Sequence, residues 1–587
     1  MQSRQLKTCV PGIKSTLFKE RRIDIMNTNI IQIPIGTLTI QSTFVTPEMF
    51  GAKGDGVADD TDAVAKALTT GKHVLLHGVY AVRGGITSTA KRVIGDDAKL
   101  IALADATIVV EFSGLNELSG VTLDCNNKNI CYGFKITKSN PTIKNVVVCN
   151  IRKTNVNTKA SVCGMYISGG KVTIDGYTAK DLYAVGNRAV SDAFGSVNGV
   201  IVSGYEDLVA KNLTFEEIHS INSTGDVVFE DAAGLYIANS SSKTANAVVS
   251  CVKGKNFGKR LIKSQTYYVS IDNVFAINEM GDNLSFIGIL PPGGDTTGLK
   301  RASAMISNCT LIDTYEEAKA LDGSTVRRVV AITGDVAVSN CKFITTNCFC
   351  ASVEQGGNAS FSQCEFGAYG ILHHGNNLDV LGCAFKSKIG IHSNITPTGK
   401  TIIANTKMNW LDGDKSFSYV YNTFKGVYFI TNSIIEAGSS VSNIHIYDFA
   451  KLSNVVFTVE NQNRTKVSDI VYVEHTANVI MDNIYIDASK MTDVLSIRYF
   501  SNYGKLLIDG MEERNNTTLY FVKNNGTLTL KNTPIERIYS TDGNLIVDQP
   551  PYVDSLPSKS RYPDGISVRL KTDDRLYTKT NGKWVVV

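Results

Sequence analysis

Short runs of alternating apolar and polar residues recur along most of the chain, each introduced by a polar turn residue. Ser339-Asn340-Cys341-Lys342-Phe343 is repeated almost unchanged as Ser362-Gln363-Cys364-Glu365-Phe366. Other copies carry Val, Leu or Ile in place of Cys, as in Asn145-Val146, Asn212-Leu213, Asn273-Val274, Asn454-Val455 and Asn483-Ile484. Alternation with period two predicts strands, and a phrase that returns every roughly 20 to 35 residues predicts a solenoid of stacked parallel strands.

An array of β-sandwiches is the alternative all-β fold. It requires hairpin turns such as Asn-Gly between paired strands, and few such pairs occur before the C-terminal end. There, Arg575 to Val585 reads as a hairpin around Asn581-Gly582, after a Pro-containing stretch over 549–563. We therefore expect one solenoid followed by a small C-terminal β element that closes its edge or joins chains.

A glycine-rich string, FGAKGDGVADDT, occupies Phe50 to Thr61. Its glycines permit a tight turn, and Asp59-Asp60-Thr61 offers an N-cap for the helix-compatible run over 63–68. The string resembles, almost letter for letter, the initial motif of the pectate-lyase-like right-handed β-helix proteins, a group rich in phage tailspikes that degrade bacterial surface polysaccharides. In that group the motif is structural, so its Asp55, Asp59 and Asp60 are expected to be turn and cap residues.

The resemblance implies a right-handed parallel β-helix divided into four segments. These are a leader or attachment segment over 1–43, the motif with its capping helix over 44–85, the β-helix over 86–545, and the C-terminal element over 546–587. Met26 is a candidate natural start, since residues 1–25 lack apolar periodicity. The resemblance also implies a homotrimeric phage or prophage protein of the virion, attached to a tail, a baseplate or another tailspike protein. Its partner would be a capsule or lipopolysaccharide glycan.

Charge and composition narrow the partners further. The formal net charge is +4 and charged residues make up 19% of the chain, which argues against a nucleic-acid partner. No apolar run is long enough for membrane insertion, and the charged first residues do not form a secretory signal. The twelve cysteines show neither metal spacing nor a disulfide framework, so we expect reduced cysteines stacked from coil to coil, and no metal or other cofactor.

The candidate site follows from aligning three coils. Gly199-Val200-Ile201-Val202 aligns with Gly234-Leu235-Tyr236-Ile237 and then with Arg260-Leu261-Ile262-Lys263. Charged residues flank these strands. Glu216 and Glu217 precede a long loop that carries further acids, and a group of cations follows one coil later. The proposed catalytic acids are Asp231, Asp282, Glu230, Glu279 and Asp226, and the proposed substrate-binding residues are Arg260, Lys263, Lys259, Tyr236, Tyr267 and Tyr268.

This pattern suits cleavage of an acidic polysaccharide, since cations bind sugar carboxylates while acids transfer protons. Carboxylates one coil apart would match the roughly 5 Å of a retaining glycosidase, and two coils apart, as for Asp231 and Asp282, the roughly 6.5 to 9.5 Å of an inverting one. The competing interpretation is that each acid is a solvated or capping turn residue. An acidic group at Asp313, Glu316 and Glu317 is the reserve site.

Two other functions remain open. A polysaccharide lyase would use Lys or Arg to remove a proton next to a sugar carboxylate. A non-catalytic fibre or adhesin would bind the glycan without cutting it. If the chain is a trimer, the site can also lie between subunits.

Overall fold

The computed structural model describes residues 44–587, apart from segments 155–161, 186–195, 411–421, 438–443, 460–465, 490–495, 516–519, 534–542, 548–551 and 557–563 and the positions 223, 240, 296, 298–299, 388, 394–395, 398, 554–555, 565–566 and 574. The predicted leader over 1–43, the candidate start at Met26 and most of the Pro-containing stretch lie outside the described residues.

Two sheets make up most of the coils. The 28-stranded sheet contains β1 (Phe44–Val45), β2 (Asp55–Asp59), β3 (His73–Leu76), β4 (Val79–Val82), β6 (Arg92–Ala102), β8 (Glu117–Lys128), β10 (Thr142–Lys153), β12 (Lys171–Val185), β14 (Asp207–Ile221), β16 (Asn246–Phe257), β18 (Tyr268–Asn278), β20 (Ser303–Ser307), β21 (Thr310–Asp313), β23 (Asp335–Ser339), β24 (Lys342–Thr345), β26 (Asn358–Ser362), β27 (Glu365–Phe366), β29 (Leu378–Leu381), β30 (Ala384–Ser387), β32 (Lys400–Ala404), β33 (Lys407–Trp410), β35 (Val427–Thr431), β36 (Ile434–Ala437), β38 (Phe449–Val459), β40 (Asn478–Ala488), β42 (Lys505–Asn515), β44 (Thr527–Lys531) and β45 (Asn544–Val547). The 12-stranded sheet contains β5 (Ile86–Ser88), β7 (Ala106–Ser113), β9 (Ile130–Thr137), β11 (Val162–Ser168), β13 (Val197–Ser203), β15 (Ala232–Ala238), β17 (Lys259–Gln265), β19 (Asn283–Ile289), β22 (Arg328–Ile332), β25 (Phe349–Val353), β28 (Tyr369–His373) and β31 (Ile389–His392).

Two smaller sheets complete the described strands. The 5-stranded sheet contains β34 (Asn422–Phe424), β37 (Ile444–Ile446), β39 (Lys466–Val473), β41 (Ser496–Asn502) and β43 (Tyr520–Asn524). The C-terminal sheet contains β46 (Tyr552–Val553), β47 (Ser567–Leu570), β48 (Leu576–Thr580) and β49 (Lys583–Val586). The helical segments are η1 (Pro47–Phe50), α1 (Thr61–Thr69) and η2 (Pro292–Gly294).

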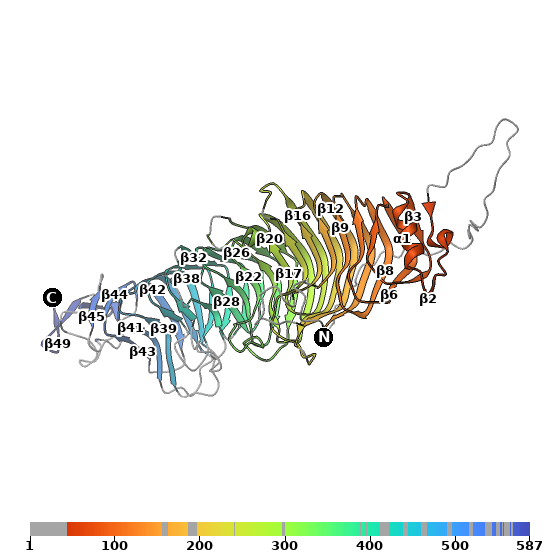
Figure 1. Ribbon diagram of the computed structural model, residues 1–587. Helices are drawn as coiled ribbons and strands as arrows, with labels where there is room; N and C mark the ends of the chain where they lie inside the picture. Colours follow the sequence, from red (N-terminus) through yellow and green to blue (C-terminus); the bar gives the residue numbers. More distant parts are fainter. Residues whose placement is uncertain are drawn as a thin grey trace, which may run out of the picture. The chain divides into compact units, whose positions relative to one another are not determined.

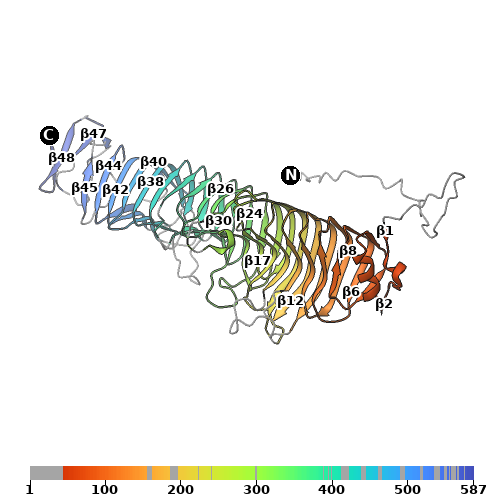
Figure 2. The ribbon, with the colours of Figure 1, turned by 45° about the horizontal axis from the view of Figure 1, so that its top comes forward.

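Successive coils stack in chain order, as Figures 1 and 2 show by the progression of colours. Within a coil the chain runs along the 28-stranded sheet and then along the 12-stranded sheet, for example from β14 into β15. The next coil repeats this with β16 and β17, and both pairings are parallel. One apolar cluster fills the interior from Val45 to Val568. The fold is therefore the expected parallel β-helix.

The polar turn residues of the repeat are the points at which long strands bend. Asn145, Asn212, Asn273, Asn454 and Asn483 all adopt left-handed backbone angles, with φ between 50° and 56°. Asn tolerates this conformation better than most residues because its short side chain bonds locally. The Nδ2 of Asn483 donates to Oδ1 of Asn454 at 2.7 Å, so successive coils are also joined through their side chains.

The cysteines of the repeat form the predicted reduced column. All eleven cysteines that the structure describes are free, and Cys309, Cys341, Cys364 and Cys383 are almost fully buried. The N–H of Cys364 donates to the Sγ of Cys383 at 3.5 Å. In the following coils Thr406 and Ser433 take the same place, since the N–H of Thr406 donates to Ser433 Oγ at 3.2 Å.

The glycine-rich motif builds the first coil and its cap. α1 begins after Asp60, the predicted N-cap, and buries Val64, Ala67 and Leu68. The Asp60 carboxylate makes no bond to the helix, however, and instead accepts the N–H groups of Lys53 and Gly54 at 2.7 and 3.1 Å. Its side chain therefore closes the glycine turn, while the position of the cap was predicted correctly.

The C-terminal sheet contains the predicted hairpin. β48 and β49 pair antiparallel across Asn581 and Gly582, whose φ values are 48° and 72°. Positive φ at both turn positions matches the right-handed twist of the two strands.

The predicted alignment of three coils needs one correction. Val200, Leu235 and Ile262 are ladder partners, so Gly199 and Gly234 align as expected, but the next residue in that column is Leu261 rather than Arg260. Gly234 faces the interior, because a Cβ there would lie 2.7 Å from the Phe215 ring. The apolar Leu261 follows Gly234 in the column, and Arg260 aligns with Ala233 instead.

Candidate functional site

Four of the proposed site residues meet on the outer side of the 12-stranded sheet. Asp231, just before β15, accepts Lys263 Nζ of β17 at 2.8 Å and lies 3.5 Å from Nη1 of Arg260. The Lys263 ammonium is also 4.5 Å from the ring centroid of Tyr236, its ladder neighbour. Stacking of β15 on β17 is thus what joins the acid, the two cations and the aromatic ring.

Gly288 of β19 makes room for the Arg260 side chain. Gly288 is the ladder partner of Lys263, and a Cβ there would lie 2.9 Å from both Cδ and Nε of Arg260. One coil further on, β22 contributes Arg328, whose Nη1 pairs with Oε1 of Glu354 at 2.8 Å. Arg260, Lys263 and Arg328, which we call the cation cluster, therefore span three consecutive strands of this sheet, β17, β19 and β22.

The cation cluster carries unused hydrogen-bonding capacity. Nε of Arg260 and Nε of Arg328 are buried without a hydrogen-bond partner among the described residues, as is the hydroxyl of Ser285. Burial lowers the pKa of the Arg260 guanidinium, against the attraction of Asp231. Burial would raise the pKa of Asp231, but Lys263 and Arg260 outweigh it and hold that pKa below its usual range. The arrangement can accept an anionic group.

Asp282 belongs to a different network from Asp231. It is fully buried, and its Oδ2 lies 2.7 Å from Nδ1 of His219, which is also fully buried. On the other side of the imidazole, Nε2 lies 3.4 Å from Oε2 of Glu217. The strands that Asp231 and Asp282 precede are two coils apart, as expected, with β17 between them. Asp282 contacts His219 rather than solvent, and its proposed catalytic role stays a prediction.

The remaining proposed acids and Lys259 lie around this corner of the coil. Asp226 is exposed and accepts bonds from Thr224 and Asn222 inside its own turn. Glu279 is exposed, and its N–H donates to Asn256 Oδ1. Glu230 is half-buried directly before Asp231. Lys259 has its ammonium 5.2 Å from the Phe229 ring centroid.

The two adjacent tyrosines face opposite sides of β18, as alternation predicts. Tyr267 is 9% exposed and Tyr268 is 50% exposed. Tyr268 belongs to the 28-stranded sheet, so it does not join Tyr236. It lines a separate groove of about 750 Å³ together with Met305 and Asp335.

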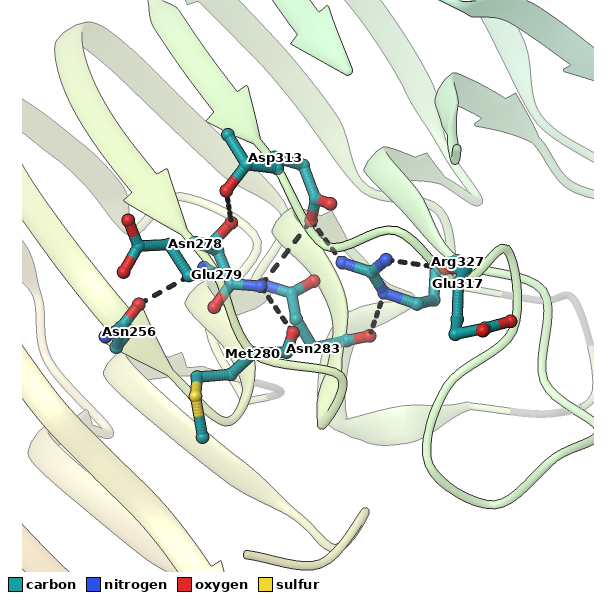
Figure 3. A network of polar contacts seen from close by, with 9 residues as sticks. Asn256, Asn278, Glu279, Met280, Asn283, Asp313, Glu317 and Arg327 are labelled. Carbon is teal, nitrogen blue, oxygen red and sulfur yellow. Dashed lines mark hydrogen bonds and ion pairs between the residues drawn. The ribbon is translucent and has the colours of Figure 1, made fainter. Parts of the chain in front are cut away.

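The reserve acidic group is a scaffold at Asp313, drawn in Figure 3. The Arg327 guanidinium donates to the Asp313 carboxylate, and both side chains are almost wholly buried. Arg327 also donates to the carbonyls of Glu317 and Asn283, at 2.9 and 3.4 Å. Burial raises the pKa of Asp313 in spite of Arg327. The pair fixes the start of β19, and Glu316 and Glu317 are exposed beside it.

Several residues of this region were not among the proposed site residues. Arg328, Glu354 and Gly288 belong to coils beyond the three that were aligned, so no local motif marks them. His219 is a single histidine in an apolar strand, and only the fold brings it to Asp282. Within the described ranges, no three His, Cys, Asp or Glu side chains are grouped so that they could hold a metal ion. No helix of the described part is long and apolar enough to cross a membrane.

Comparison with known proteins gives distant structural likeness alone. No protein-family model matches this chain, and no curated protein matches it significantly. ORF18 of Geobacillus virus E2 is 15% identical to this chain, with a TM-score of 0.28. The match covers 59% of this chain and 62% of ORF18, so this chain spans less than two thirds of ORF18. PfbA, a surface adhesin of Streptococcus pneumoniae, is 12% identical with a TM-score of 0.29 over 78% and 91%. The tailspike protein gp49 of Pseudomonas phage LKA1 is 12% identical with a TM-score of 0.29 over 85% and 84%.

Structural likeness of this degree does not identify the function of this chain. The assignment to the parallel β-helix class rests on the parallel pairing of successive coils described above.

Proposed function

We propose that this protein binds and shortens an acidic bacterial surface polysaccharide, as a tailspike depolymerase of a phage or prophage. The observation that carries the proposal is the cation cluster, with two buried guanidinium Nε groups that lack partners among the described residues. Guanidinium groups bind carboxylates through paired hydrogen bonds, and Tyr236 beside them offers an apolar face to a sugar ring. A polymer of uronic acids has both features.

Hydrolysis is the preferred reaction, and β-elimination is the second candidate. A specific observation favours elimination: burial lowers the pKa of Arg260 within a site that would hold the sugar carboxylate. In elimination a Lys or Arg side chain takes the proton from the carbon next to the sugar carboxylate. Elimination gives an unsaturated product that absorbs ultraviolet light, whereas hydrolysis gives new reducing ends without it.

The test measures binding and chain length on the same polymers. Purified protein is incubated with alginate, polygalacturonate, hyaluronan and a panel of uronate-containing capsules, with dextran as the neutral control. We expect binding to at least one acidic polymer, a decrease in its length by gel filtration, and no binding to dextran. If the polymer binds but keeps its length, the protein is a glycan-binding fibre. Absence of binding to every acidic polymer would overturn the proposal.

Variants locate the binding. R260Q and R328Q each remove a charge-assisted interaction of about 1.5 to 3 kcal/mol, so affinity should fall roughly 10- to 100-fold. R83Q is the matched control, because Arg83 is exposed and pairs with Asp59 in the first coil. Equal affinity of all three variants would show that the polymer binds elsewhere.

The virion setting is part of the same proposal. A homotrimer attached to a phage tail, a baseplate or another tailspike protein agrees with the resemblance of the Phe50 to Thr61 motif and with the β-helix. Light scattering of the purified chain gives the number of subunits, and a monomeric mass would contradict that part.

A further inference from the structure

A second column of left-handed residues crosses four coils of the 28-stranded sheet. Asn150, Asp181, Glu217 and Asn256 have φ values of 59°, 54°, 52° and 45°. Lys180 pairs with Glu216 and Leu182 with Ile218, so Asp181 and Glu217 between them occupy the same register position. The pairings of β10 with β12 and of β14 with β16 place Asn150 and Asn256 at that position too. Asp181 and Glu217 are therefore direct neighbours, one coil apart.

The two middle residues of this column are poor choices for stability alone. The flanking coils use Asn, which tolerates a left-handed backbone, whereas Glu rarely adopts it. Two carboxylates at the coil spacing of about 4.8 Å also repel each other. Strained or repelling groups of this kind are retained most often at functional sites. The departure from Asn at Asp181 and Glu217 is thus the feature that needs an explanation.

A buried histidine lies next to Glu217. His219 is fully buried, and its Nε2 makes no hydrogen bond of good geometry, yet it lies 3.4 Å from Oε2 of Glu217. Its Nδ1 is held by Asp282 at 2.7 Å. Asn256 donates its Nδ2 to the other oxygen of Glu217 at 2.9 Å. Glu217 is therefore fixed on one side and remains about one third exposed.

Asp181 is in a different environment. Among the described residues it accepts no hydrogen bond and forms no ion pair. Burial, helped by the charges of Glu217 and Glu216, raises its pKa above the usual range in spite of the nearby Lys180. The His219 imidazole at 3.4 Å lowers the pKa of Glu217 instead. Neighbouring carboxyl groups whose pKa values are pushed apart are suited to be an acid and a nucleophile.

An aromatic ring lies beside the two carboxyl groups. Tyr183, two residues after Asp181, is half-buried and stacks on His219 with ring centroids 5.9 Å apart. The guanidinium of Arg152 lies 5.5 Å from the Tyr183 ring centroid. A sugar ring and a carboxylate substituent could be held by these two side chains.

We propose that Asp181 and Glu217 are the acid/base and the nucleophile of a retaining glycosidase, with His219, Asn256 and Asp282 as positioning residues. The inference rests on the proposed function and names the residues that cut the polymer. Side chains one coil apart match the roughly 5 Å between carboxyl groups of retaining enzymes. The same coils lead from β14 into β15 and from β16 into β17, the strands that carry Asp231 and two of the cations.

The reaction has two balanced steps. The Glu217 carboxylate attacks the anomeric carbon and forms an ester bond, while the glycosidic C–O bond breaks and its oxygen takes the proton of Asp181. Water then attacks the same carbon and gives a proton to the Asp181 carboxylate, and the ester bond breaks to restore Glu217. Two inversions leave the anomeric configuration unchanged, and only water is consumed.

The test uses the acidic polymer that the full-length protein shortens in the experiment above. D181N and E217Q should each lower the rate of shortening by about 10²- to 10⁴-fold with binding changed less than threefold. E365Q is the matched control, since Glu365 is an exposed acid of the same sheet in a distant coil, pairs with Lys342 at 3.6 Å and should not affect the rate. Proton NMR of the first product should show retention at the anomeric carbon.

Stability gives a readout independent of the substrate. D181N puts into this coil the residue that Asn150 and Asn256 provide in the same column, so it should not lower the melting temperature while it abolishes cleavage. Lower stability with full activity would show a structural role and overturn the proposal, as would inversion at the anomeric carbon. Loss of activity in D231N and D282N, with D181N and E217Q active, would place catalysis at the other acids. If the wild-type chain binds an acidic polymer but shortens none, the proposed catalytic pair is wrong, while the binding proposal still holds.

Discussion

His219 is the most strongly perturbed histidine of the corner between the two main sheets. Burial alone would lower its pKa, but the bonds to Asp282 and Glu217 outweigh burial and raise that pKa to about 9. The titratable groups facing it are those two carboxylates and the stacked Tyr183. A protonated imidazole between two acids is therefore the form that the fold favours.

This predicts how stability changes with pH. Because the folded pKa of His219 lies above the unfolded value near 6.5, its contribution is complete below pH 6.5 and is lost as pH rises through 9. The shift corresponds to roughly 3 kcal/mol. Denaturant unfolding of wild type and H219Q between pH 6 and pH 10 measures it. The difference in unfolding free energy should be largest at pH 6 and smallest at pH 10, and a constant difference would contradict the prediction.

The buried pair of Asp313 and Arg327 makes a second prediction for single residues. R327M leaves the Asp313 carboxylate buried without its cation, so unfolding free energy should fall by about 3 to 5 kcal/mol. The double variant with D313N should recover much of that loss, because no buried charge remains. The exposed pair of Lys342 and Glu365 is the control, since K342M should cost less than about 1 kcal/mol. Equal losses in both single variants would show that the buried charge is not the cause.

Single residues were predictable from sequence where the coil itself brought them together. Asp231, Arg260 and Lys263 meet because they flank neighbouring strands of one sheet. Asp181 could not be chosen from the sequence, because its pairing with Glu217 depends on the register of two long strands. Arg328 was missed for a related reason, since a loop of unpredictable length separates its coil from that of Arg260.

Among the elements, the bends of the long strands depend on the asparagine ladder. N483A should lower unfolding free energy by roughly 1 to 2 kcal/mol, because Ala is strained in the left-handed region and loses the bond to Asn454. N483G should cost less, since Gly adopts φ near 53° freely and Gly510 already occupies this position in the next coil. Thermal unfolding of both variants measures this, and a larger loss for Gly than for Ala would reverse the explanation.

The cysteine column is an element without covalent links. Because the cysteines of the described coils are free, dithiothreitol should change the melting temperature by less than about 1 °C. C364S, which mimics the place of Ser433 in its own coil, is the companion variant and should stay folded. A marked drop in melting temperature with the reductant would reveal a disulfide and contradict the reduced column.

Register at the level of elements was predicted in part. The bend residues Asn212 and Asn273 indicated the pairing of the first and third coils correctly, with Cys251 in the same position between them. The strand at Arg260 was misplaced by one residue, because the sequence alone does not tell whether Arg260 or Leu261 follows Gly234 in the column. A repeat fixes the class of fold more firmly than the position of each side chain.

In the whole molecule, each coil buries its apolar residues only against its neighbours, so the two ends of the stack need covers. At the first coil α1 is that cover, as Figure 1 shows, and its own Leu68 faces the coil and is 1% exposed. The carbonyl of Leu68 also accepts the N–H groups of Thr89 and Ala90, at 3.0 and 3.1 Å. The helix is thus bonded to the coil that it covers.

L68D places a charge in this interface and should undock the helix. The apolar end of the first coil and its unpaired strand edges would then be exposed, which favours association of one stack with another. We expect a lower melting temperature and higher-order species in size-exclusion chromatography, whereas K66D, on the outer face of the same helix, should behave as wild type. Since neighbouring coils stabilise each other only locally, hydrogen exchange in L68D should increase near β3 and β6 and remain unchanged near β40 and β42. Uniform exchange along the stack would show that the coils unfold as one unit and that the cap protects all of them.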